Sequence, residues 1–357
     1  MNNIAPLIDF DDFQHTKAET SLSRLGIFNA FDLGRTEFPA IKFIVPGYLP
    51  EGATILAGRP KLGKSWLALD LALAVAKGSK CLGVECEQGD VLYLAMEDNK
   101  RRLQSRLQKL SPARELDPWP SSLEMVTEWK RHDQGGIEDI EAWAATKRAP
   151  RLVIVDVLAQ FRGGRGNTET QYEADYAAVK SLQEVAGELQ IAILIIHHVK
   201  KGIGETDPFE KVSGTLGLTG AADTTIILDR DQSGCTLYCR GRDIQEYERA
   251  VTFDKFDCRW LVQGEASEVR RTDERSIILE VLLGAEDILT VAEIVSATGM
   301  NRNACDQLLY KMAKDGQITK AKRGHYYHPD RTDLTPSTPH KIDKKIRNSE
   351  NDEGESA

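Results

Sequence analysis

The sequence lacks the features that would place a protein in a membrane or outside the cell. No apolar run approaches the roughly 18 residues that a membrane-spanning helix needs, and Asp70 interrupts the longest candidate. The N-terminus has no basic region followed by an apolar core, so we expect no secretory signal. The six cysteines form no CxxC pair, and without an export signal we expect reduced thiols rather than disulfides. These absences together predict a cytoplasmic protein.

The chain also lacks an excess of positive charge. With 46 Lys and Arg against 55 Asp and Glu, its formal net charge is −9. This balance argues against coating of nucleic acid by bulk charge, although it leaves room for a local basic channel or groove. The content of 41% hydrophobic and 28% charged residues is typical of a globular protein, and 357 residues suggest two folded domains.

What the sequence does contain is a complete phosphate-binding loop. Residues 58–65 read GRPKLGKS and match G-x-x-x-x-G-K-[ST] at every fixed position, between an apolar strand-like segment and a helical segment without breakers. Such a loop turns backbone N–H groups onto phosphates, while Lys64 would reach the β/γ oxygens and Ser65 would hold Mg²⁺. An ordinary strand–helix turn is the less favoured alternative. We therefore expect ATP to bind at Gly58, Arg59, Pro60, Lys61, Leu62, Gly63, Lys64, Ser65 and Trp66.

An acidic pair follows a second apolar strand. Residues 91–96 lead into Glu97 and Asp98, and a helix is expected over residues 100–110. Catalytic groups of α/β sheets gather at the carboxyl ends of strands, and attack on a γ-phosphate needs a residue that orients or deprotonates water. The alternative is that both residues cap the helix. We expect Asp98 to cap and Glu97 to act in catalysis.

Two further apolar strands end in polar residues. The first, residues 152–156, delivers Asp156, which can hold Mg²⁺ through water; the next residue is Val157, so the catalytic carboxylate must come from elsewhere, in favour of Glu97. The second, residues 191–197, ends in His197 and His198. Neighbouring residues of a strand face opposite sides, so the pair cannot easily share a metal. We expect one of them to sense the γ-phosphate.

This ordered set resembles the RecA-like ATPases, and more closely the hexameric replication helicases of plasmids and phages of the RepA type, which are relatives of the DnaB helicases. The segments that carry the resemblance are GRPKLGKS (58–65), AMED (95–98), LVIVD (152–156), IIHH (195–198) and SGTLGLTGAAD (213–223). The resemblance covers about residues 38–264. It implies an α/β fold with a RecA-like P-loop core and a mainly parallel sheet. It assigns water activation to Glu97, Mg²⁺ binding to Asp156 and phosphate sensing to His197 or His198.

The resemblance also implies a basic finger that reaches the ATP of a neighbouring subunit. The segment CRGRD (239–243) matches the K-x-R-like finger of this group, with Arg240 in place of lysine. RepA-type enzymes instead carry an arginine shortly before the SGT segment, where this sequence has only Lys211. We rank Arg242 first and Arg240 second; the alternative is a solvated arginine on an edge strand. A finger acting in trans predicts a homo-oligomer, and head-to-tail interfaces close into rings, here a hexamer.

Two glycine-bearing, cationic loops would line the channel of such a ring. They span residues 160–175 and 199–217, and each follows a strand that is expected to touch ATP. Their cations suit the backbone of single-stranded DNA, although ordinary flexible loops are the alternative. We expect contacts from Arg162, Arg165, Lys200, Lys201 and Lys211.

The C-terminal part is predicted to form a winged helix-turn-helix. A helix is expected at residues 275–283, a capping box at Thr290–Glu293 opens a second, Asn301 caps a third over 302–315, and a hairpin surrounds Arg323. Between residues 299 and 329 the local charge is +4, which suits duplex DNA contact through Lys320, Lys322 and Arg323; a protein-binding module is the alternative. The expected domains are an arm (1–35), an ATPase core (36–265), the winged helix (268–330) and a disordered charged tail (331–357).

The sequence leaves two classes of function open. The first is a DNA-dependent ring ATPase, a replicative helicase that translocates on single-stranded DNA in plasmid, phage or mobile-element replication. The second is a RecA-like ATPase that is no helicase and that its winged helix recruits to DNA as a regulator or loader. Fold analogy does not separate them, since one core hosts both.

Overall fold

The computed structural model describes residues 27–113, 117–163, 171–199, 207–210, 216–231 and 234–334. The chain divides into two units, Met1–Lys42 and Phe43–Ala357. In the first unit the structure describes one short helix, α2 (Ala30–Leu33), which Asn29 caps by accepting a hydrogen bond from the Asp32 backbone. Most of the predicted arm (residues 1–26) and of the predicted tail (residues 335–357) lies outside the described residues.

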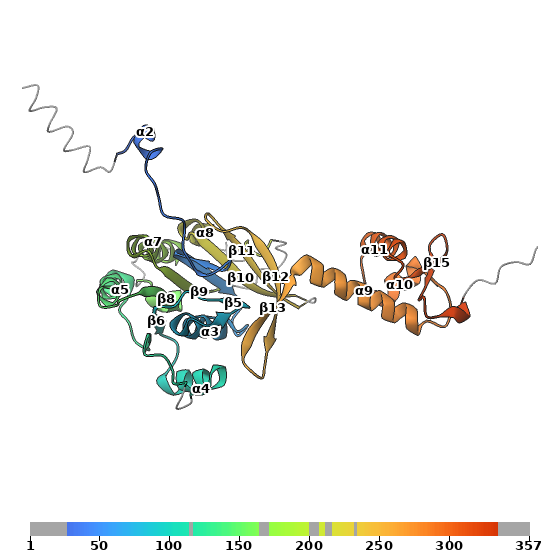
Figure 1. Cartoon of the computed structure of the whole chain (residues 1–357), viewed down its shortest axis with the longest axis horizontal. Helices are drawn as coiled ribbons and strands as arrows, with labels where there is room; N and C mark the ends of the chain where they lie inside the picture. Colours follow the sequence, from blue (N-terminus) through green and yellow to red (C-terminus); the bar gives the residue numbers. More distant parts are fainter. Residues whose placement is uncertain are drawn as a thin grey trace, which may run out of the picture. The chain divides into compact units, whose positions relative to one another are not determined.

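A nine-stranded sheet forms the centre of the second unit (Figure 1). Its order is β13-β12-β11-β10-β3-β9-β8-β6-β7. From β10 to β7 the strands are parallel, and from β10 to β13 they are antiparallel. The bounds are β3 (Gly52–Gly58), β6 (Asp90–Ala95), β7 (Leu123–Val126), β8 (Pro150–Asp156), β9 (Ala192–His198), β10 (Thr224–Asp231), β11 (Gly234–Gly241), β12 (Tyr247–Asp254) and β13 (Arg259–Glu265).

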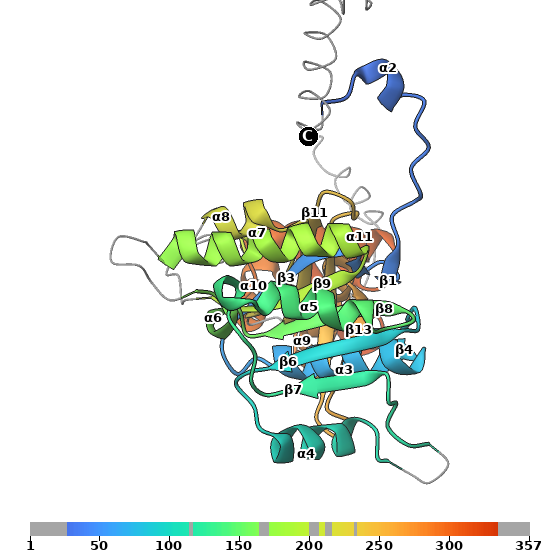
Figure 2. The ribbon, with the colours of Figure 1, turned by 90° about the vertical axis from the view of Figure 1, so that its left-hand side faces the viewer.

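Helices cover both faces of the sheet, because its central strands are apolar on both sides. Leu56, Ile154 and Leu194 pack into one core with α3 (Lys64–Lys77) and α4 (Lys100–Leu110). Their strand neighbours Ile55 and Val153 pack into a second core. This second core contains α5 (Gly136–Ala145), α6 (Leu158–Phe161), α7 (Gln171–Leu189) and α8 (Leu216–Ala221). Both views place α3 and α4 on one side of the sheet and α7 and α8 on the other (Figures 1 and 2).

The predicted α/β fold with a RecA-like core is confirmed by this strand order. The strand before the phosphate loop, β3, is followed across the sheet by β9, β8 and β6, the strands that carry the histidines, Asp156 and the Glu97 turn. Two short strand pairs, β1 (Phe43–Val45) with β2 (Leu49–Pro50) and β4 (Lys80–Cys81) with β5 (Val84–Glu85), lie outside the main sheet, and a short helix, η1 (His132–Gln134), precedes α5.

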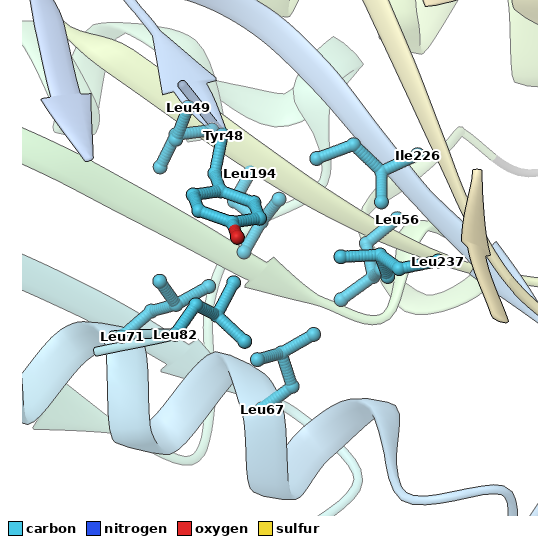
Figure 3. Close-up of a pocket in the computed structure, with 9 residues that line it drawn as sticks. All are labelled: Tyr48, Leu49, Leu56, Leu67, Leu71, Leu82, Leu194, Ile226 and Leu237. Atoms are coloured by element: carbon cyan, nitrogen blue, oxygen red, sulfur yellow. The ribbon is translucent and has the colours of Figure 1, made fainter. Parts of the chain in front are cut away.

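A small cavity lies in the core between α3 and the sheet (Figure 3). Its volume is about 10 Å³, close to the minimum that can hold one water molecule. The lining is apolar apart from Tyr48, so the cavity is an imperfection of packing rather than a ligand site. The lining residues are Tyr48, Leu49, Leu56, Leu67, Leu71, Leu82, Leu194, Ile226 and Leu237.

The C-terminal part has the elements that the sequence predicts. It contains α9 (Ala266–Gly284), β14 (Leu289–Thr290), α10 (Val291–Thr298), α11 (Arg302–Lys314), β15 (Thr319–Lys322), β16 (His325–Tyr327) and a final short helix, η3 (Thr332–Leu334). The capping box at Thr290 is present, and Asn301 caps α11. Three strands pair in the order β14-β16-β15, over a separate apolar core that includes Ile278, Ile294 and Leu309. The winged-helix assignment stays a prediction.

The first helix of this part differs from the expectation. It begins at Ala266, directly after β13, and not at Arg275. The added turns contact β12 and β13, and Arg270 donates hydrogen bonds of 3.2 Å to Thr236 Oγ1 and to the Tyr238 hydroxyl. The expected boundary at residues 265–268 therefore falls at the start of a continuous helix. In the part of the chain that the structure describes, no helix has the length and apolarity needed to cross a membrane.

Candidate functional site

The phosphate loop connects the end of β3 to the first turn of α3. Lys64 is the first residue of α3, and its ammonium folds back to donate hydrogen bonds to the carbonyls of Gly58 (2.7 Å) and Arg59 (3.0 Å). The residue is only 3% exposed, and burial lowers the pKa of Lys64 to about 8. Glycine is required at position 58, because a Cβ there would lie 2.5 Å from the Leu228 carbonyl oxygen on β10. The first N–H groups of α3 face the loop, as anion binding requires.

His198 stands between the loop lysine and the predicted catalytic acid. Its Nδ1 lies 3.0 Å from Lys64 Nζ, and its Nε2 lies 3.9 Å from Glu97 Oε2. Burial and the neighbouring Lys64 ammonium lower the pKa of His198, so the ring is neutral near pH 7. Because Lys64 is a donor, Nδ1 is the accepting nitrogen and Nε2 carries the proton toward Glu97. Three residues predicted to act on one γ-phosphate are thus side by side.

Asp156 lies on the neighbouring strand with two hydroxyl donors. The buried Tyr93 hydroxyl donates to Asp156 Oδ2 over 2.7 Å, and the Ser65 hydroxyl also hydrogen-bonds to this carboxylate. Burial raises the pKa of Asp156, and these two hydrogen bonds oppose the rise. A serine hydroxyl in contact with a carboxylate is the oxygen donor set that Mg²⁺ prefers, so the predicted pair fits this ion. Tyr93 was not predicted; the one signal for it is a lone polar atom within the apolar strand VLYLA.

His197 points to the opposite face of β9. Burial lowers the pKa of His197, and the carboxylate of Asp175 on α7 opposes this effect. Arg162 pairs with the same carboxylate at 2.8 Å. The two histidines therefore belong to different environments, as the alternation along a strand requires. Among the described residues, no group of three or more His, Cys, Asp or Glu side chains could hold a metal ion.

A family model described as "AAA domain" matches residues 21–203, just over half of the chain. The chain belongs to this AAA domain family. The match includes the phosphate loop, Glu97, Asp156 and both histidines. Together with the P-loop geometry, it makes the protein an ATPase.

Two solved structures are distantly similar to this AAA domain protein. The first is an isolated ATPase domain, 13% identical with a TM-score of 0.49, over 68% of this chain and 97% of that chain. The second is a DnaB-like replicative helicase, solved in a study of its interactions with primase. It is 15% identical with a TM-score of 0.46, over 69% of this chain and 70% of that chain.

The expected capping role of Asp98 in the AAA domain is wrong. The cap of α4 is Asn99, whose side chain accepts a hydrogen bond from the Arg102 backbone at 2.9 Å. Asp98 lies one residue too early to reach that position, and its carboxylate instead pairs with Arg102 (3.2 Å) and Arg106 (2.6 Å). Arg106 also lies over the ring of Trp66, 5.5 Å from its centroid. Asp98 thus anchors the Glu97 turn to α4 and, through Arg106, to the start of α3.

The two candidate finger arginines of the AAA domain protein lie near the end of β11, away from its own phosphate loop. Arg240 pairs with Thr225, which in turn pairs with Ile55, three residues before Gly58. At about 3.3 Å per residue, Arg240 is roughly 10 Å from the loop along the strand, and Arg242 is farther away.

The two arginines also have different partners. Arg240 is held by Asp207 (2.8 Å), Glu246 (3.5 Å) and the Phe209 ring, 4.2 Å from its centroid. Arg242 contacts Asp223 (3.4 Å) and the Gly220 carbonyl (2.9 Å), and its side chain is 61% exposed. Arg242 is the less constrained of the two.

The predicted DNA-contacting residues are only partly described. Arg165, Lys200, Lys201 and Lys211 lie outside the described residues. Arg162 is described, and its ion pair with Asp175 leaves the side chain 19% exposed, so contact with DNA would require this pair to open. In the C-terminal hairpin, Lys320, Lys322 and Arg323 are exposed.

Proposed function

We propose that the protein couples ATP hydrolysis to movement along single-stranded DNA, as a ring-forming replicative helicase. The observation that carries the proposal is the convergence of Lys64, His198, Glu97 and Asp156 at the carboxyl ends of four adjacent parallel strands. Each residue type matches one requirement of phosphoryl transfer: a cation for the phosphates, a group that senses the γ-phosphate, a base and a metal ligand.

In the proposed reaction, Lys64 and the first N–H groups of α3 bind the phosphates. Ser65 and Asp156 hold Mg²⁺, which supplies charge neutralisation on the phosphate oxygens when bound. Glu97 orients the attacking water and accepts its proton, since its carboxylate is exposed at the strand edge. His198 links Glu97 to Lys64, so we assign phosphate sensing to His198 rather than to His197.

Assembly into a ring is proposed from the position of the finger candidates. An arginine on the far side of β3 from its own loop supplies transition-state charge only to the ATP of another subunit. Arg242 is preferred because it is exposed and has the longer ion pair. The same interface repeated head to tail gives a closed ring, for which we propose six subunits.

The DNA part of the proposal rests on the sequence and its resemblance to the replication helicases. The loops over residues 160–175 and 199–217 would contact single-stranded DNA with Arg162, Arg165, Lys200, Lys201 and Lys211. The exposed Lys320, Lys322 and Arg323 would contact duplex DNA or a replication protein. Plasmid, phage or mobile-element replication is the proposed setting.

The test is steady-state ATP hydrolysis with and without single-stranded DNA. We expect hydrolysis that requires Mg²⁺ and rises with DNA, and we expect Glu97→Gln to bind ATP but to lose most of the turnover, because an amide accepts no proton. Asp98→Asn is the matched control, since Asp98 is turned toward Arg102 and Arg106. A Glu97→Gln variant with wild-type turnover would refute the assignment. Hydrolysis without any response to DNA would favour the regulator or loader.

A further inference from the structure

A tryptophan from the edge of the sheet reaches the phosphate loop. Trp260 lies on β13, a strand that is not part of the expected nucleotide site, and only 3% of the residue is exposed. Its indole Nε1 donates a hydrogen bond of 3.2 Å to the carbonyl oxygen of Gly63. That carbonyl also accepts the backbone N–H groups of Trp66 and Leu67, both at 3.1 Å. The indole therefore adds a side-chain bond at the point where the loop becomes helix α3.

The shape of the loop at Gly63 depends on this contact. Gly63 has a φ of 105°, which side chains rarely adopt, and a Cβ there would lie 3.2 Å from the indole ring. The ring is held from behind by Phe253, whose centroid lies 5.3 Å away, and Phe253 lies 6.4 Å from the ring of Trp66. Next to Trp260, Arg259 pairs with the buried Asp70 of α3 at 3.2 Å. Consecutive residues of β13 thus grip α3 at two places.

We propose that Trp260 is a positioning residue for phosphate binding. The peptide group between Gly63 and Lys64 is planar, so its carbonyl and its N–H point in opposite directions. Holding the Gly63 carbonyl against the indole aims the Lys64 backbone N–H toward the phosphates. Trp260 touches no reacting atom itself; it acts through the loop. This inference rests on the proposed nucleotide site.

The test compares ADP binding, by calorimetry, in wild type and in Trp260→Phe. Phenylalanine keeps an aromatic ring but removes the N–H donor. Loss of one such bond predicts an ADP dissociation constant raised by roughly 2- to 10-fold. For hydrolysis, we expect a higher KM with little change in kcat, because Lys64, Glu97 and His198 are untouched. A role in stability alone would lower the melting temperature of the variant and leave the dissociation constant unchanged.

Trp119→Phe is the matched control. The Trp119 indole also donates to a backbone carbonyl, that of Ser111, at 2.8 Å, and it packs against the same core away from the loop. We expect this variant to bind ADP as wild type does. An unchanged dissociation constant in Trp260→Phe, or an equal rise in both variants, would overturn the inference. If wild type itself bound no nucleotide, the proposed function would fail, and this inference with it.

A second measurement needs no substitution at Trp260, in case Trp260→Phe does not fold. In Trp66→Phe, Trp260 is the remaining tryptophan that contacts the phosphate loop, since Trp119, Trp129 and Trp143 have partners elsewhere. Saturating ADP should still change the tryptophan emission of this variant, because phosphate charge alters the field at an indole bonded to the loop. Emission that stays constant while calorimetry shows bound ADP would overturn the proposal.

Discussion

The lowered pKa of Lys64 gives a prediction about the pH dependence of nucleotide binding. Burial sets the pKa of this ammonium to about 8, against about 10.4 for a free lysine. Below pH 8 the ammonium is charged and attracts phosphate; above pH 8 it becomes neutral in the free protein. Bound phosphate stabilises the charged form, so binding at higher pH requires the uptake of a proton.

The magnitude follows from this difference. At about pH 9 roughly one molecule in eleven carries a charged Lys64 before ADP binds, so the dissociation constant should be about 10-fold higher than at pH 7. That factor corresponds to about 1.4 kcal/mol. Affinity should continue to fall by up to about 10-fold for each further pH unit, until the pKa of Lys64 in the complex is reached.

The assay is titration calorimetry with ADP between pH 6.5 and pH 9.5, in buffers of different ionisation enthalpy. We expect about one proton taken up for each ADP bound at the alkaline end, and almost none at pH 6.5. Lys64→Arg is the control, because a guanidinium stays charged over this range and its binding should show little of the dependence. A wild-type dissociation constant that stays flat to pH 9.5, with no proton uptake, would refute the reasoning.

Three further predictions concern individual parts of the protein. His198→Ala should lower hydrolysis by about 10-fold or more, whereas His197→Ala should affect it less, because only His198 contacts Lys64 and Glu97; steady-state rates of both variants decide this, and a larger loss in His197→Ala would reverse the assignment. Arg242→Ala should bind ATP yet lose hydrolysis, and mixing it with Lys64→Ala subunits should restore some activity; no recovery, together with a monomeric mass in ATP and Mg²⁺, would count against the ring. Deletion of residues 268–357 should keep ATPase activity, since Trp260 is retained, and should weaken binding to duplex DNA or a partner, as should replacement of Lys320, Lys322 and Arg323 by Ala; an inactive but folded core would contradict this division.

Much of the fold was predictable because buried parallel strands read as continuous apolar runs. The strands that end at Gly58, Ala95, Asp156 and His198 were all expected within two residues of their observed ends. Strand β13 was missed, because its sequence, RWLVQGE, alternates polar and apolar residues at the edge of the sheet. The indole contact of Trp260 with Gly63 joins residues 197 positions apart, and no local pattern announces such a contact.

The candidate site was predictable in its residues more than in its connections. Alternation along β9 separates His197 from His198, but it does not tell which of them faces the phosphate loop; the parallel pairing of β9 with β3 decides that. The role of Asp98 was misassigned because a cap and an ion-pair acceptor look alike in sequence, and the choice depends on where α4 begins. The hydrogen bond from Tyr93 to Asp156 depends on the pairing of β6 with β8, which sequence spacing does not specify.

The proposed nucleotide site should drive movement along single-stranded DNA. ATP-dependent displacement of one strand from a tailed duplex, with Mg²⁺ and with Glu97→Gln as the inactive control, tests this most directly. We predict displacement by wild type that requires ATP and a single-stranded tail, and none by Glu97→Gln. Brisk ATP hydrolysis without displacement, on tails of either polarity, would contradict the claim.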